Sequence, residues 1–218
     1  MSEVIHHLSA DQQEYIHTRS AIILADVGQS WGQLRDKKVL DLGTAAGILL
    51  IAASLHPNID IAGIENDPGY YRRKKRDFPE VEMWKKFPPD EPKYVIGDAK
   101  KMPFHDGSFD VVISHAAPPT LPVSDESELT AVVSEIRRIL KPGGQAYIFP
   151  GYFDLFVRYI SSGKISPEKD QEESNQATIK TQEFLARNFS DLRTTLVTLP
   201  QQERRRPQNY MVLQKHVA

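Results

Sequence analysis

The stretch VLDLGTAAG, residues 39–47, decides the fold of this chain. A short apolar strand leads into Asp41 and a turn of small residues, and an apolar helix at 48–55 follows. An α/β protein forms a ligand crevice in this way, at the carboxyl end of its first strand. Gly43 and Gly47 carry no Cβ, so the backbone can bend sharply there and a ligand can lie against it.

Acidic residues end the next two predicted strands. Residues 59–64 form a second buried strand that ends at Glu65, about 20 residues past the turn, where a carboxylate usually holds a ribose hydroxyl pair. A third strand, 94–97, ends at Asp98. The sequence therefore predicts that polar groups from several strand tips face one crevice.

The alternation of helix and strand continues beyond this point. Residues 111–114 form a fourth, apolar strand, and an amphipathic helix then ends in LKPGG at 140–144. A fifth strand follows at 146–149. The apolar stripe of the helix indicates packing against the sheet rather than a ligand site. Its members are Leu129, Val132, Val133, Ile136, Ile139 and Leu140.

This ordered set resembles the class I S-adenosylmethionine-dependent methyltransferases, and among them the small-molecule enzymes that include the ubiquinone and menaquinone methyltransferases. The resemblance covers roughly the middle half of the chain. It implies an α/β, Rossmann-like class I methyltransferase fold: a mostly parallel seven-stranded sheet with helices on both faces and an antiparallel edge strand. The matching segments are VLDLGTAAG (39–47), GIEND (63–67), GDAKKMPFHDGSFDVV (97–112) and IRRILKPGG (136–144).

The resemblance implies S-adenosyl-L-methionine as the cofactor and assigns residues to its parts. Glu65 would hold the two ribose hydroxyls, which suits a carboxylate because it accepts hydrogen bonds without needing to donate. Asn66, the next residue, is also assigned to the cofactor. Asp98 would accept from the adenine amino group, with Ala99 beside the ring. The residues lining the methionine portion would be Asp41, Gly43, Thr44, Ala45 and Gly47.

The acceptor side is less defined. Ser114 and His115 would lie beneath the methyl group, and His115 is the candidate catalytic base because histidine titrates near neutral pH. A histidine that only bonds a loop or lines the pocket stays an alternative. Contacts to the substrate could come from Tyr152, Asp154 and Arg158, for which a solvated helix face is the alternative.

One residue departs from the family pattern. The resembling enzymes usually have glycine where Ala45 stands, and alanine does not take left-handed backbone conformations as freely. Because alanine is the smallest replacement, we expect cofactor binding to be kept, with a slightly shifted loop. A relative that no longer binds the cofactor would be expected to lack Glu65 or Asp98 as well.

Composition limits the class of protein. With 218 residues the chain fits one domain, and its 40% hydrophobic and 26% charged content is typical of a soluble globular protein. The net charge of −2 gives no general attraction to nucleic acid or acidic membranes. The lack of cysteine excludes disulfides and thiolate metal sites, and no metal is expected because His6 and His7 are isolated.

We expect a single methyltransferase domain over 1–218. A first helix would run to about Val27 and stop at Gly28, with Ile16, Ile22, Ile23 and Val27 on one face. Tyr15 or His17 could line the pocket, but packing of this helix on the sheet is the favoured interpretation. The parts are 1–30 (N-terminal helix or lid), 36–150 (cofactor-binding core), 151–174 (substrate-contacting insertion) and 175–218 (C-terminal helix and two last strands).

The leading hypothesis is an enzyme that transfers a methyl group to an oxygen, nitrogen or carbon of a small molecule. We expect a cytoplasmic location, because residues 1–9 lack a secretory pattern and no apolar run could span a membrane. Nucleic acid is not an expected partner. The oligomeric state stays open, with a homodimer as one option.

Three alternatives remain. A nicotinamide oxidoreductase would need G-x-G-x-x-G, where this chain has Gly43, Ala45 and Ile48. A non-catalytic cofactor-binding or scaffold protein could share the fold. A methyltransferase acting on RNA or protein is the third, although APPT at 117–120 lacks the polar and aromatic positions of an amino-group-gripping motif.

Overall fold

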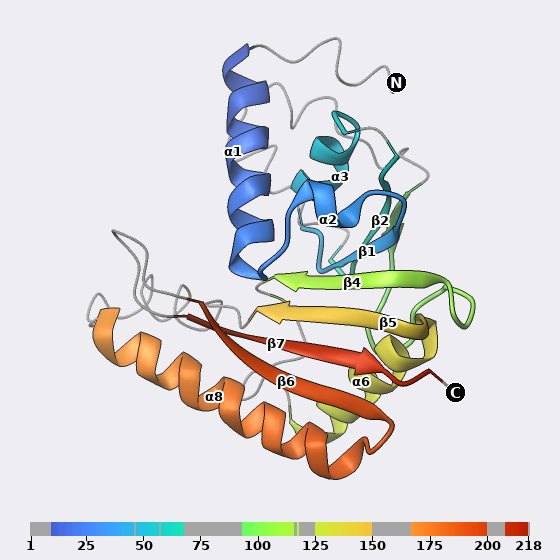
Figure 1. Cartoon of the computed structure of the whole chain (residues 1–218), viewed down its shortest axis with the longest axis vertical. Coiled ribbons are helices and arrows are strands. Elements are labelled where there is room, and N and C mark those ends of the chain that lie inside the picture. Colours follow the sequence, from blue (N-terminus) through green and yellow to red (C-terminus); the bar gives the residue numbers. More distant parts are fainter. Residues whose placement is uncertain are drawn as a thin grey trace.

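The computed structural model describes residues 10–45, 47–56, 58–67, 93–115, 117, 125–149, 167–199 and 208–217 (Figure 1). Within them lies one sheet with helices on both faces. The helices are α1 (Ala10–Asp26), α2 (Trp31–Leu34), α3 (Ile48–Ala53), α6 (Glu126–Ile139) and α8 (Pro167–Asn188), and the strands are β1 (Lys38–Leu42), β2 (Asp60–Glu65), β3 (Tyr94–Ile96), β4 (Phe109–His115), β5 (Leu140–Phe149), β6 (Leu192–Leu199) and β7 (Gln208–Lys215).

The seven strands follow the order β3-β2-β1-β4-β5-β7-β6, which confirms the predicted sheet. Neighbours from β3 to β5 are parallel. Strand β7 is antiparallel to both β5 and β6, so the antiparallel strand lies one position inside the sheet edge formed by β6. The chain leaves β1 toward β2 on one side and reaches β4 on the other. Their carboxyl ends therefore form the switch point at which open α/β sheets bind ligands.

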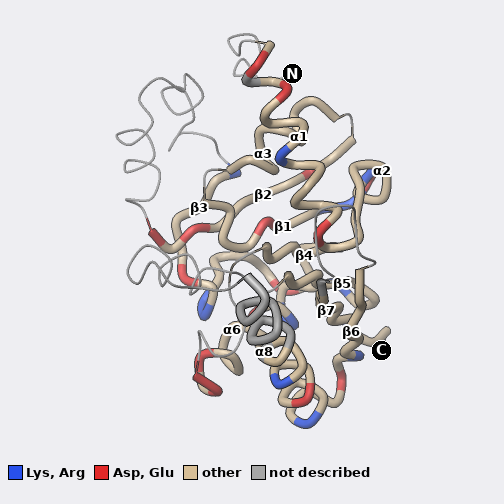
Figure 2. The backbone as a smooth tube through the Cα atoms, turned by 90° about the vertical axis from the view of Figure 1, so that its left-hand side faces the viewer, with Lys and Arg blue, Asp and Glu red and all other residues tan. Residues whose placement is uncertain are grey.

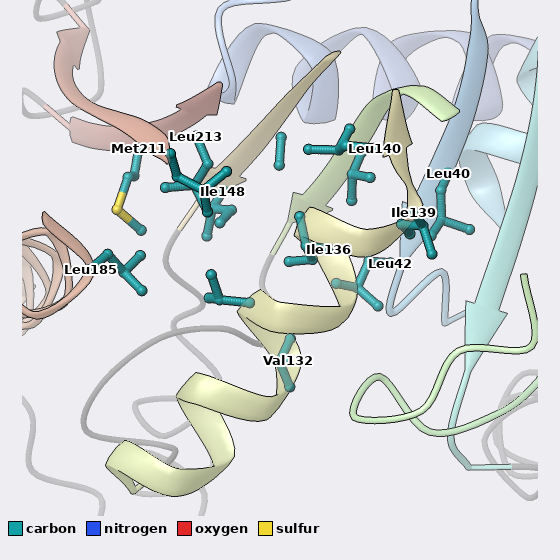
Figure 3. Packing of buried hydrophobic residues seen from close by; sticks show 14 of the residues in the cluster. Leu40, Leu42, Val132, Ile136, Ile139, Leu140, Ile148, Leu185, Met211 and Leu213 are labelled. Atoms are coloured by element: carbon teal, nitrogen blue, oxygen red, sulfur yellow. The ribbon is translucent and has the colours of Figure 1, made fainter. Parts of the chain in front are cut away.

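Strand residues alternate between two hydrophobic clusters on opposite faces of the sheet. Val39 packs in the cluster that includes α1 and α3, whereas Leu40 and Leu42 pack in the cluster that includes α6 and α8. In the second cluster the predicted apolar stripe of α6 is buried, and Ile136 and Ile139 lie over Leu40 and Leu42 (Figure 3). The helical spacing of apolar residues in the sequence thus predicted which side of α6 enters the core.

Helix α1 packs against α3, a contact that the favoured interpretation, packing on the sheet, did not name. Its predicted apolar face is partly wrong: Ile16 and Val27 are buried, but Leu24 joins them while Ile22 and Ile23 are only half-buried. The helix ends before Gly28, which adopts φ +64°. A Cβ at Gly28 would collide with the ring of Tyr210, so both backbone conformation and space favour glycine there.

The predicted start of the last helix is wrong. Helix α8 begins at Pro167, so the polar residues 167–174, expected as part of an exposed insertion, are helical. Glutamate, lysine and glutamine are good helix formers, and proline is tolerated in the first turn. Residues 151–166 lie outside the described residues. None of the helices in the described part of the chain has both the length and the apolar character needed to cross a membrane.

A single guanidinium joins the turn after β3 to α6. Arg138 donates to both carboxylate oxygens of Glu135, at 2.7 and 2.8 Å. It also donates to the carbonyl oxygens of Met102 (2.9 Å) and Phe104 (2.7 Å) and to the carboxylate of Asp106 (2.8 Å). The hydrogen bond from Arg138 lowers the pKa of Glu135, whose carboxylate also accepts the Met102 N–H. The turn that carries Asp98 and Ala99 is therefore held to the helix.

We expect Arg138→Lys to lower the free energy of unfolding by about 1.5–3 kcal/mol, because one ammonium cannot replace a fork that reaches four groups. Arg137→Lys is the matched control. Its ion pair with Asp191 is exposed, and loss of such a pair costs about 0–1 kcal/mol. Urea unfolding of both variants measures the two losses of stability. Equal losses would contradict the stabilising role assigned to the Arg138 hydrogen bonds.

Candidate functional site

The turn after β1 is built from alternating left-handed residues. Gly43, Ala45 and Gly47 have φ of +74°, +49° and +67°. The N–H groups of Gly43 and Thr44 both donate to the Ile64 carbonyl oxygen of β2, at 2.9 and 3.1 Å. The predicted glycine bend is confirmed. Ala45 occupies the left-handed conformation that its position in the family pattern predicts.

Ala117, two residues beyond the end of β4, lies against this bend. A Cβ on Gly43 would fall onto the Cβ of Ala117, so any side chain at 43 would push Ala117 away from the bend. The carbonyl oxygen of Ala117 accepts a hydrogen bond of 3.0 Å from the Ser114 hydroxyl, which is buried. Gly43 is therefore required for the close approach of Ala117 to the bend after β1.

The buried carboxylate of Glu65, at the end of β2, joins the bend after β1 to β2. Glu65 Oε2 accepts the Ala45 N–H at 3.0 Å, and Oε1 accepts the Asp67 N–H at 3.1 Å. The Ala45 carbonyl oxygen accepts a hydrogen bond of 2.9 Å from the Tyr94 hydroxyl of β3. The turn after β1 is thus tied to β2 through Glu65 and to β3 through Tyr94. Each carboxylate oxygen has two acceptor lone pairs, so accepting one N–H does not exhaust it.

Asp41 lies beneath the same bend. Its buried carboxylate accepts a hydrogen bond of 2.6 Å from the Thr44 hydroxyl. Burial raises the pKa of Asp41 from 3.8 to about 7, the Thr44 hydrogen bond opposes this rise, and the negative charge of Glu65 adds to it. Strand alternation places both acids on the sheet face that packs on α1 and α3, because Val39 and Ile61 point that way.

Asp98 lies at the exposed margin of this group. It comes after Gly97, the residue that follows β3. The Gly97 N–H donates to the Glu65 carbonyl oxygen at 2.9 Å, so the ends of β2 and β3 are adjacent. The Asp98 carboxylate accepts the Lys100 N–H at 2.8 Å and lies 3.9 Å from the Lys100 ammonium. Ala99 packs on the α6 side, and Asn66 is exposed. Viewed from the strand ends, acidic segments lie beside β1, β2 and β3 (Figure 2).

His115 ends β4 on the same sheet face as Asp41 and Glu65. Its Nε2 lies 2.9 Å from the Asp26 carboxylate of α1, and its ring stacks on Phe149 with centroids 5.0 Å apart and planes 7° from parallel. Ser114, one residue earlier, points to the opposite face, so the structure does not bring it to this group. Sequence reasoning missed Asp26, which is 89 residues away in the chain; only its place at a helix end signalled it.

Other predicted contacts fall elsewhere. Tyr152, Asp154 and Arg158 lie outside the described residues. The Tyr15 side chain is exposed, and the His17 ring lies 6.3 Å from that of His56 beyond the end of α3. The body of α1 therefore covers α3, and only its last turn reaches the strand ends.

The strand order and the acidic strand ends define the class I methyltransferase form of the Rossmann-like fold. Residues 40–148, half of the chain, match the family model described as methyltransferase domain. The chain belongs to this family.

Individual relatives match the same half. A demethylmenaquinone methyltransferase from Chlorobaculum tepidum is 31% identical over 114 residues, 52% of this chain and 40% of the relative. A sterol 24-C-methyltransferase from Pneumocystis carinii is 35% identical over 106 residues, 49% of this chain and 26% of the relative. The chain thus spans less than half the length of either relative.

Solved structures extend the likeness to nearly the whole chain. A candidate S-adenosyl-L-methionine-dependent methyltransferase from Methanococcus maripaludis has a TM-score of 0.60 at 15% identity. The superposition covers 95% of this chain and 90% of that chain. At this identity the match shows a shared fold.

We expect Ala45→Gly to raise the free energy of unfolding by about 0.5–1 kcal/mol. An alanine in the left-handed conformation costs about 1–2 kcal/mol, and glycine removes this cost. The greater backbone freedom of glycine in the unfolded chain cancels only part of the resulting stabilisation. Ala21→Gly, at an exposed position inside α1, is the control and should lose about 1 kcal/mol. Thermal and urea unfolding measure both variants; a loss at both positions would refute left-handed strain at Ala45.

The raised pKa of Asp41 predicts a pH dependence. Between about pH 4 and pH 7 the folded chain keeps a proton that the unfolded chain releases, so this group's contribution to stability falls as pH rises. Asp41→Asn cannot titrate, so the variant should gain about 2 kcal/mol relative to the wild type between pH 5 and pH 7. Urea unfolding at both pH values tests this, with Asp191→Asn as an exposed control. Parallel profiles for the wild type and Asp41→Asn would contradict it.

Proposed function

We propose that this protein is an S-adenosyl-L-methionine-dependent methyltransferase that acts on a small-molecule acceptor. The observation that carries the proposal is the buried carboxylate of Glu65 bonded to the Ala45 N–H. This bond holds the Glu65 carboxylate against the glycine bend, at the switch point of the sheet. A carboxylate there can accept hydrogen bonds from the two hydroxyls of a diol. Membership of the methyltransferase domain family supports it.

The residues fit the cofactor. Glu65 can accept two hydroxyls of a ribose, with Asn66 beside it. Asp98 would hold the adenine amino group and Ala99 the ring. When bound, the cofactor supplies an electrophilic methyl group on a positively charged sulfur, to which acidic strand ends are complementary. The methionine portion would lie along Asp41, Gly43, Thr44, Ala45 and Gly47.

The acceptor is inferred only as a class. The matched relatives are named for demethylmenaquinone and for a sterol, both small molecules, but the matched half of the chain carries the cofactor residues. Methyl transfer needs a lone pair of the acceptor atom aligned with the methyl carbon. A protein meets most of this requirement by holding the acceptor in the right position. We infer that His115 is the base where the acceptor atom carries a proton, and that Tyr152, Asp154 and Arg158 contact the acceptor. Ser114 and a cytoplasmic location stay predictions from the sequence.

Isothermal titration with S-adenosyl-L-methionine and S-adenosylhomocysteine tests the cofactor assignment. We expect the wild type to bind both. Glu65→Gln should weaken binding about tenfold or more, because it removes the charged acceptor of the ribose hydroxyls. Asp60→Asn, at the other end of β2, is the control and should stay within about twofold. Failure of the wild type to bind either ligand would refute the enzyme assignment and favour a scaffold protein.

A labelled-methyl assay tests the acceptor class. Cell extract is separated into small-molecule and macromolecular fractions, and each is incubated with the protein and methyl-labelled S-adenosyl-L-methionine. We expect label in the small-molecule fraction. Label confined to protein or RNA would favour the alternative of a macromolecular substrate.

A further inference from the structure

We propose that Asp26 is a positioning residue that holds the His115 ring with Nδ1 as its basic nitrogen, so that His115 takes the proton of an O–H or N–H acceptor. The proposal rests on the proposed function. It adds a carboxylate from α1 to a site otherwise built from the strand ends.

The two side chains form a largely buried pair. The Asp26 Oδ2 and His115 Nε2 atoms lie 2.9 Å apart, and the side chains are 12% and 14% exposed. Phe149, paired with His115 in the register of β4 and β5, stacks almost parallel to the imidazole. One ring face and one ring nitrogen therefore have defined neighbours, which limits rotation of the ring.

The end of α1 fixes the position of the carboxylate. Leu24 and Val27, on either side of Asp26, are buried in the core. The last turn is closed by hydrogen bonds from the N–H groups of Val27 and Gln29 to the Leu24 carbonyl oxygen, at 3.1 and 2.8 Å. Gly28 then turns the chain in a left-handed conformation against Tyr210. Asp26 thus reaches His115 from a helix end that the core holds in place.

The pairing determines which nitrogen can act as a base. A carboxylate only accepts hydrogen bonds, so the neutral imidazole donates its Nε2–H to Asp26. The lone pair then lies on Nδ1. After Nδ1 has taken a proton, the carboxylate lies 2.9 Å from an imidazolium and pairs with its charge. Asp26 is thus suited both to hold the tautomer and to compensate the charge that proton transfer creates.

The proton and electron balance follows from this arrangement. The acceptor oxygen or nitrogen forms a bond to the methyl carbon, and the bond from that carbon to sulfur breaks with its electron pair left on sulfur. The proton of the acceptor atom passes to His115 Nδ1 and then to solvent. No further reactant is required.

Nitrogen-15 NMR of the full-length chain tests the tautomer without any acceptor. His115 is identified by the loss of its signals in His115→Gln. We expect protonated Nε2 and unprotonated Nδ1 in the neutral wild-type ring. Asp26→Asn should shift both nitrogens toward a mixture of tautomers, because an amide can donate as well as accept. Asp11→Asn, at the first turn of the same helix, should leave them unchanged.

Kinetics separate a positioning role from a purely structural one. With methyl-labelled S-adenosyl-L-methionine and the small-molecule extract fraction, turnover should fall about a hundredfold in His115→Gln. It should fall at least about tenfold in Asp26→Asn, with S-adenosylhomocysteine affinity within about twofold of the wild type. Asp11→Asn should retain wild-type turnover.

Each outcome has one meaning. A wild-type ring protonated on Nδ1, or nitrogens unmoved in Asp26→Asn, overturns the assignment of Asp26. Normal turnover in Asp26→Asn, with only a lower melting temperature, overturns its positioning role and shows a structural pair. If the wild type does not bind S-adenosylhomocysteine, the proposed function is refuted instead. The NMR result still reports on the Asp26–His115 pair, so failure of the proposed function and failure of this inference can be told apart.

Discussion

The site depends on one hydrogen bond, from the Ala45 N–H to the carboxylate of the buried residue Glu65. A buried carboxylate without donors would be strongly destabilising, so this bond and the one from the Asp67 N–H allow Glu65 to remain inside. The same bond holds Ala45 in a left-handed conformation that an alanine adopts at a cost. This hydrogen bond thus offsets part of both costs, the backbone strain at Ala45 and the burial of the Glu65 carboxylate.

Strand alternation then determines which residues share one face of the sheet at the strand ends. Three site residues lie an even number of positions after apolar residues of the cluster that includes α1 and α3: Asp41 after Val39, Glu65 after Ile61 and His115 after Ile113. All three side chains therefore lie on the face of the sheet that α1 and α3 cover. That face receives the carboxylate of Asp26 from the last turn of α1. Ser114 takes the opposite face for the same reason. The two-residue period of a strand therefore puts Asp41, Glu65 and His115 on one face of the sheet and their neighbours in sequence on the other.

Much of this arrangement could be predicted from the sequence. The α6 stripe is buried as its helical spacing indicated, and the last two strands follow the C-terminal helix as expected. The glycine bend after β1 and the acid at the end of β2 also occupy the predicted positions in their elements. The start of α8 was missed because its polar first half carries no apolar periodicity, only helix-forming composition. Leu24 was missed because the direction from which α3 packs decides which stripe of α1 is buried.

The sequence by itself determined the elements, the order in which they form a sheet, and the acids at the strand ends, because each follows from the residue types within a short segment and from the family pattern. Only the tertiary structure decided that Glu65 bonds the turn after β1, that Gly43 lies against Ala117, and that Asp26 bonds His115. These contacts join segments far apart in the chain. Their geometry depends on how helices pack on the sheet, which no local pattern of residues encodes.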